Sequence, residues 1–169
     1  NDGGWSAFVP IQSLVDAYET SSGLTIEEAE KNGEYDPVHP YKNRDPRFYA
    51  TVLYSGADWV NPNGVYRIYN TLDRTIDGKP NKDNANDSRN ASQSGYTCCK
   101  YMSPLTQYSD INNTGLDFIV FRYAEVLLSK AEALIELNRD LDEACNLMDE
   151  VRKRAGMPMV DRNKYSTQA

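Results

Sequence analysis

The sequence has few of the residues that would hold a small fold together through disulfides or a metal. Among its 169 residues there are 3 Cys and 1 His. Cys98 and Cys99 are adjacent and Cys145 is distant, which is not the spacing of a disulfide framework. A zinc site would need paired cysteines or several histidines. We therefore predict no metal site, and we expect the cysteines to be small buried thiols.

Excess positive charge and long apolar runs are also lacking. The formal net charge is −7, so the basic surface that nucleic-acid binding requires is not expected. No apolar run approaches the roughly 18 residues of a membrane-spanning helix. The chain opens on Asn1 without a signal-peptide pattern. We expect it to be a mature chain or an excised piece.

Sequence signatures of catalysis are missing as well. A glycosidase needs two carboxylates that face one bond, and no motif here pairs two of the 25 acidic residues in that way. Nucleophile elbows, phosphate-binding glycine loops and HExxH are not found. The sequence therefore predicts a protein that is not an enzyme and uses no cofactor.

The pattern along the chain predicts a mainly α-helical protein with irregular loops and a few short strands. Apolar residues at helical spacing indicate a helix over 11–18, and Thr25 with Glu28 forms the capping box of a short helix. Aromatic and β-branched residues predict a strand over 47–54. The stretch 77–88 has neither helical nor strand periodicity and is predicted to be a long polar loop.

The strongest pattern is a helical hairpin over 117–156. Apolar residues recur every three or four positions on both sides of a break at Asn138, and Asp140 is expected to cap the second helix. Gly156 and Pro158 end it. The short connection predicts antiparallel packing of the tetratricopeptide type. Because one such hairpin cannot bury both faces, we expect one apolar face to be exposed or to be covered by another copy of the chain.

Four blocks of the chain, taken together and in this order, resemble the SusD/RagB family. They are 10–18 (PIQSLVDAY, with Gly4 and Trp5 upstream), 41–54 (YKNRDPRFYATVLY), 121–128 (FRYAEVLL, followed by Ala131-Glu132-Ala133) and 152–158 (RKRAGMP). The resemblance implies a SusD-like fold with tetratricopeptide-like hairpins beside a loop-rich region. It also implies that 1–169 is one fragment from the carboxy-terminal half of such a domain. Within it we expect a loop-rich region over 1–115, the hairpin over 116–158 and a tail over 159–169.

The resemblance also implies a function. SusD-like proteins are non-enzymatic lipoproteins of the outer membrane of Bacteroidetes, facing the cell surface. They bind a glycan, or in some members peptides, and pass it to a SusC-like TonB-dependent transporter. The resemblance leads us to expect that the lipid anchor of the full-length parent lies outside this sequence. Two alternatives stay open, namely a peptide-binding member of the same uptake family and a tetratricopeptide-type protein–protein adaptor.

Candidate ligand residues are the aromatic and amide side chains of the middle region. Sugars present apolar C–H faces and hydroxyl edges, so their sites combine flat aromatic rings with amide or carboxylate groups. The chain holds 12 Tyr, 2 Trp and 4 Phe, an excess of rings with a polar tip. We expect Trp59 to be the leading candidate, with the ligand contacted by Trp59, Asn61, Asn63, Tyr66, Tyr69 and Tyr96. Tyr49, Tyr54 and Tyr123 are expected to pack inside with their hydroxyls bonded.

Overall fold

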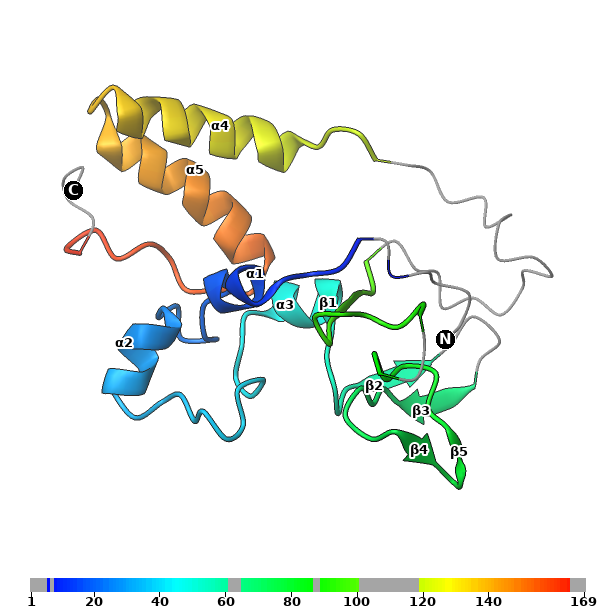
Figure 1. Ribbon diagram of the computed structural model, residues 1–169. Coiled ribbons are helices and arrows are strands. Elements are labelled where there is room, and N and C mark those ends of the chain that lie inside the picture. Colours follow the sequence, from blue (N-terminus) through cyan, green and yellow to red (C-terminus); the bar gives the residue numbers. More distant parts are fainter. Residues whose placement is uncertain (1–5, 7, 61–64, 87–88, 101–118, 165–169) are drawn as a thin grey trace. The chain divides into compact units, whose positions relative to one another are not determined.

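The computed structural model describes residues 6, 8–60, 65–86, 89–100 and 119–164 (Figure 1). The chain divides into two compact units, each described below by itself. The strand unit comprises 1–16 and 48–117, and the helical unit comprises 17–47 and 118–169. Among the described residues no helix is long and apolar enough to cross a membrane.

Two antiparallel helices dominate the helical unit. They are α4 (Tyr123–Glu136) and α5 (Leu141–Arg154), which lie side by side and are joined by a short turn (Figure 1). Their shared core is formed by Leu127, Ala131, Ala144, Leu147 and Val151. The small side chains of the buried Ala131 and Ala144 allow the two backbones to approach closely. The helical hairpin is therefore confirmed, and its tetratricopeptide type stays a prediction.

The ends of these helices differ in part from the prediction. Asp140 adopts left-handed backbone angles (φ 48°, ψ 49°) and makes no side-chain cap hydrogen bond, so the expected capping was wrong. An N-cap residue normally has extended backbone angles, which direct its side chain at the N–H groups of the first turn. The left-handed angles of Asp140 do not direct its carboxylate there. Gly156 has φ 75° just after the last helical residues, which is the glycine stop that the sequence predicted.

Several apolar side chains of α4 and of the residue that follows it are exposed, as expected for a lone hairpin. Tyr123 is 71% exposed and Leu137 64% exposed, and Val126 and Leu128 are exposed as well. The expectation that Tyr123 packs inside was therefore wrong.

A buried arginine organises the amino-terminal part of the helical unit. Arg44 is 2% exposed and donates to the carbonyl oxygens of Tyr18 (2.8 Å) and Pro40 (2.9 Å). Nearby, α2 (Ile26–Lys31) begins with the predicted capping box of Thr25 and Glu28. Charged side chains thus fix loop backbone in this region, because a buried carbonyl without a donor would be costly.

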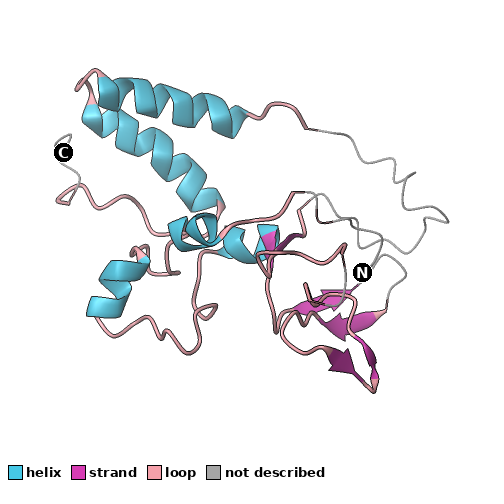
Figure 2. Ribbon diagram, viewed as in Figure 1, coloured by secondary structure: helices cyan, strands magenta, loops and turns pink. Residues whose placement is uncertain are grey.

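In its described residues, the strand unit has three separate two-stranded antiparallel sheets connected by loops (Figure 2). Strand β1 (Val52–Leu53) pairs with β6 (Thr97–Cys98), and β4 (Thr75–Ile76) pairs with β5 (Lys79–Pro80). Strands β2 (Asp58–Val60) and β3 (Tyr66–Ile68) form the third sheet. The short helix α1 (Gln12–Ala17) spans the boundary between the two units.

The predicted strand over 47–54 was wrong in its first half, which is the helix α3 (Pro46–Thr51). Proline favours the first helical position, and the Asp45 carboxylate accepts the Arg47 backbone N–H at 2.7 Å, as an N-cap does. The helix buries Phe48, whose ring stacks on that of Tyr54 with centroids 5.3 Å apart. Local capping therefore outweighed the β propensity of the aromatic residues.

Two buried asparagines order the long polar loop. The Asn81 amide donates to the carbonyls of Asn70 (2.8 Å) and Asp73 (2.7 Å). The Asn84 amide donates to those of Thr71 (2.9 Å) and Leu72 (3.0 Å). Two side chains three positions apart thus donate to all four carbonyls of one turn, over 70–73. We call this arrangement the asparagine clamp.

The cysteines do not all match the expectation of buried thiols. Cys145 is buried, Cys99 is half-buried and Cys98 is exposed, and all three are free. Burial raises the pKa of the Cys99 thiol, with a smaller contribution from Cys98 beside it. In the described ranges no group of three or more His, Cys, Asp or Glu side chains is arranged to hold a metal ion.

Candidate functional site

The β2–β3 hairpin carries most of the predicted ligand residues and divides them between its two faces. Its register pairs Asp58 with Ile68, Trp59 with Arg67 and Val60 with Tyr66. Because side chains alternate along a strand, the first and third pairs share one face and the middle pair lies on the other. We call the face of Asp58, Val60, Tyr66 and Ile68 the outer face of the hairpin. The face of Trp59 and Arg67 is the inner face.

The outer face is exposed and combines apolar surface with one carboxylate. Tyr66 is 60% exposed, and Val60 and Ile68 beside it are exposed too. The Tyr66 hydroxyl donates to Asp58 Oδ1 at 2.6 Å. This hydrogen bond raises the pKa of the Tyr66 phenol and, since it ties down the tip of the ring, holds the side chain along the sheet. A flat ring with a carboxylate at its edge suits a sugar face and its hydroxyls.

The inner face packs against the interior of the strand unit. Trp59 is half-buried against the cluster of Leu53, Ala57 and Tyr69. Tyr69 is 4% exposed, and its hydroxyl lies 2.9 Å from the Thr97 hydroxyl. Burial raises the pKa of the Tyr69 phenol. Trp59 and Tyr69 therefore contribute to the support of the hairpin.

The single guanidinium of the hairpin is committed to this inner side. Arg67 forms an ion pair with the buried Asp83 and lies over the ring of Tyr69, with 5.8 Å from Cζ to the ring centroid. The backbone N–H of Asp83 donates in turn to Asn81 Oδ1 at 3.0 Å. The asparagine clamp thus positions the carboxylate that neutralises Arg67.

The structure does not gather all six predicted ligand residues on one surface. Tyr96 is 6% exposed, and its hydroxyl donates to Gln12 Oε1 at 2.8 Å. Asn61 and Asn63 lie outside the described residues. Tyr66 alone among the described candidates presents its ring on the outer face, while Trp59 lies on the opposite face. Contact of any of the six with a ligand stays a prediction.

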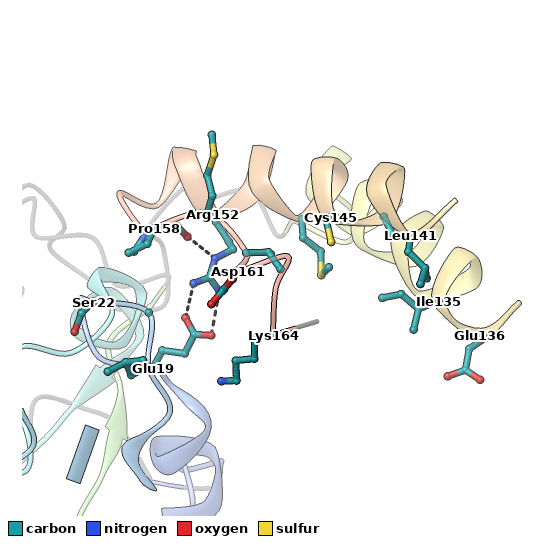
Figure 3. Close-up of a pocket in the computed structure, with 16 residues that line it drawn as sticks. Glu19, Ser22, Ile135, Glu136, Leu141, Cys145, Arg152, Pro158, Asp161 and Lys164 are labelled. Atoms are coloured by element: carbon teal, nitrogen blue, oxygen red, sulfur yellow. Dashed lines mark hydrogen bonds and ion pairs between the residues drawn. The ribbon is translucent and has the colours of Figure 1, made fainter. Parts of the chain in front are cut away.

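A second candidate site is a cavity of about 760 Å³ within the helical unit (Figure 3). Its apolar wall comes from both helices, from the loop after α1 and from the segment beyond α5, and includes Leu24, Ile135, Leu141, Met148 and Val160. A volume of this size is typical of small-molecule sites. The cavity joins segments more than a hundred residues apart, which is why sequence periodicity gave no signal for it.

Charged groups form one side of this cavity. Arg152 contacts Glu19 through two nitrogens (3.1 and 2.7 Å) and donates from Nε to the Pro158 carbonyl at 2.6 Å (Figure 3). Lys164, which also lines the cavity, pairs with Glu28. The charges of Arg152 and Lys164 are thus paired in the structure, so the cavity offers chiefly apolar contact with a polar edge.

The segment beyond α5 forms part of the cavity wall and is held by a buried carboxylate. Asp149 is 7% exposed and accepts the Val160 backbone N–H at 2.7 Å, and it pairs with Arg162 at 2.9 Å. Hydrogen bonds to a charged group are stronger than neutral ones. Asp149 therefore fixes the path of the chain past Pro158 and, with it, the shape of the cavity.

Comparison with known proteins identifies the family. A search of the curated proteins found no match. One similar solved structure is a SusD-like protein from Bacteroides fragilis NCTC 9343, with a TM-score of 0.67 and 26% identity over 95% of this chain and 31% of its own.

Another is a SusD-like carbohydrate binding protein from the same organism, with a TM-score of 0.69 and 29% identity over 94% of this chain and 30% of its own. The chain thus spans about a third of the length of these structures. The family model described as the SusD family matches residues 1–169. The predicted resemblance is therefore confirmed, and the chain belongs to the SusD family.

Proposed function

We propose that this chain is part of a non-catalytic glycan-binding protein that delivers its ligand to a SusC-like TonB-dependent transporter. Membership of the SusD family supports a role as a binding protein. The similarity to a SusD-like carbohydrate binding protein supports a glycan as the ligand of this chain too. The proposed location is the outer membrane, facing the cell surface, with attachment through a lipid anchor.

The observation that carries this proposal is the outer face of the β2–β3 hairpin. Tyr66 presents an exposed ring whose hydroxyl is fixed by Asp58. A carboxylate has two oxygens and about four lone pairs, so Asp58 can accept from a sugar hydroxyl while it holds Tyr66. We also propose Asn61 and Asn63 as ligand contacts, and Trp59 supports the face from behind.

Replacing Tyr66 tests the proposal. Affinity electrophoresis and calorimetry of the purified protein against a panel of polysaccharides identify the glycans that bind. Tyr66→Ala should weaken that binding about tenfold, as expected for loss of one aromatic stacking contact. Tyr123→Ala is the matched control, because this tyrosine is similarly exposed but lies in the helical unit. Failure of every glycan in the panel to bind would refute the proposal.

A peptide ligand is the second candidate, and the cavity favours it. An apolar wall with paired charges at one edge suits an extended peptide with apolar side chains better than it suits a sugar. Met159→Glu adds a charge at an exposed lining position and should weaken peptide binding. Binding of peptides that is lost in this variant, without binding of any glycan, would favour this candidate.

A protein–protein adaptor is the remaining alternative, and it would use the exposed apolar side chains along α4 and just after it, which include Tyr123 and Leu137. Co-purification distinguishes it from the uptake function. A soluble partner that stays bound in place of a TonB-dependent transporter, and that is lost when Tyr123 and Leu137 are both changed to Ser, would support an adaptor.

A further inference from the structure

The charges of the β2–β3 hairpin restrict the kind of glycan that its outer face can accept. Between residues 58 and 68 the sequence contains one acidic residue, Asp58, and one basic residue, Arg67. We infer that this face binds neutral glycans and discriminates against anionic ones, such as polyuronates or sulfated polysaccharides. The inference rests on the proposed function, because it assigns the class of sugar taken by the same site.

The two charges lie on opposite faces. Asp58 is paired across the sheet with Ile68, and Arg67 with Trp59, so strand alternation places the carboxylate outside and the guanidinium inside. Asp58 is exposed and its bond from Tyr66 is neutral, so its negative charge is not compensated by that partner. A ligand stacked on Tyr66 therefore meets a carboxylate within hydrogen-bond distance of the ring hydroxyl.

Arg67 cannot turn outward to bind an acidic sugar without leaving the buried carboxylate of Asp83 unpaired. Its partner Asp83 is 7% exposed, and the asparagine clamp holds that residue through Asn81. Removing one partner of a buried ion pair leaves an uncompensated charge, which is strongly unfavourable. The hairpin thus lacks the free guanidinium that recognition of a carboxylate or sulfate generally uses.

Asp58 is suited to neutral sugars for the same reason that it disfavours acidic ones. A carboxylate accepts hydrogen bonds from hydroxyl groups, which neutral sugars supply in number. A ligand carboxylate placed near the same spot would instead add like-charge repulsion. That repulsion amounts to at least about a fivefold loss of affinity at contact distance.

Chemically matched polymers test the inference. The probe is a neutral polysaccharide that the protein binds, compared with the same polymer after oxidation of its C6 hydroxymethyl groups to carboxylates. We expect the oxidised polymer to bind at least about fivefold more weakly at low ionic strength. The difference should shrink as salt is raised, since exposed charges are screened.

Oxidation both adds a negative charge to the polymer and removes its C6 hydroxyl groups. Two variants show which of these changes weakens binding. Asp58→Asn should recover most of the binding of the oxidised polymer. Asp77→Asn is the matched control, because it removes the same charge from the exposed turn between β4 and β5, where φ is 51° and asparagine is tolerated. It should leave the discrimination unchanged.

Four outcomes would overturn the inference. Binding of native anionic glycans as tightly as any neutral one, or equal binding of oxidised and unoxidised polymer, would refute it while leaving glycan binding intact. Glycan binding that is insensitive to Tyr66→Ala would place the site elsewhere and refute it as well. Binding of no glycan at all would refute the proposed function and this inference together.

Discussion

The asparagine clamp should be among the most sensitive places in the strand unit. Asn81 is 4% exposed and makes three hydrogen bonds, two from its amide to the carbonyls of Asn70 and Asp73 and one to its carbonyl from the Asp83 N–H. Asn81→Ala removes all three and leaves buried backbone groups without these partners. At a net 0.5–1.5 kcal/mol for each bond, we expect a loss of about 2–4 kcal/mol in the free energy of unfolding.

A second variant tests the role of the amide directly. Asn81→Asp has nearly the same shape and retains the oxygen that accepts from Asp83. It replaces the donating NH₂ group with an oxygen that faces two carbonyl oxygens at 2.7 and 2.8 Å. We therefore expect it to destabilise the protein at least as much as Asn81→Ala at neutral pH, although it removes no atoms from the core.

Urea unfolding followed by tryptophan fluorescence is the appropriate assay, because Trp59 packs within the strand unit. Gln93→Ala is the control, since it removes an exposed amide from the same loop region. Its effect should stay within about 0.5 kcal/mol. A loss below about 1 kcal/mol for Asn81→Ala, or an Asn81→Asp variant as stable as the original protein, would refute the idea that the clamp orders the loop.

Three further predictions concern single contacts. Gly23→Ala should lower the free energy of unfolding by about 1–3 kcal/mol, because φ is 80° there and the added Cβ would meet the Arg152 guanidinium at 3.0 Å. An unchanged melting temperature would contradict this. Asp58→Asn should lower the pKa of Tyr66 toward the ordinary tyrosine value, since the hydrogen bond to Asp58 is the main cause of its increase, and ultraviolet titration of the variant detects the change. Asp149→Ala should release the segment beyond α5, so that trypsin cleaves there faster while the helices stay intact; an unchanged cleavage rate would show that the other contacts suffice.

The helical hairpin and the short capped helix could be predicted because their signals are local. The apolar spacing that forms the core of α4 and α5 is contained in the residues themselves, as is the capping box of α2. The failures at α3 and at Asp140 have local causes too. In the first case Asp45 and Pro46 start a helix that the aromatic content concealed, and in the second the turn imposed left-handed angles on the residue expected to cap.

The asparagine clamp and the cavity could not be predicted in the same way. The polar stretch 77–88 has no periodicity, yet Asn81 and Asn84 each find two carbonyls about ten residues upstream. Such bonds depend on how a turn folds back, which composition does not specify. The cavity requires Glu19 and Arg152 to meet, although 133 positions separate them. The β4–β5 hairpin of the same region did have a local signal, because Asp77-Gly78 is a typical sequence for a two-residue hairpin turn.

The candidate ligand residues could have been divided more sharply from the sequence alone. In an antiparallel hairpin, residues at odd spacing along one strand point to opposite faces, so Tyr66 and Tyr69 cannot share a face once 66–69 is recognised as extended. The structure places Tyr66 outside and Tyr69 inside, and the pairing of Trp59 with Arg67 adds the tryptophan to the inner side. A ligand that contacts both Trp59 and Tyr66 would have to pass around the hairpin rather than rest on one sheet surface. Tyr66→Ala is therefore the cleaner test of binding, whereas Trp59→Ala would also disturb the packing that supports the face.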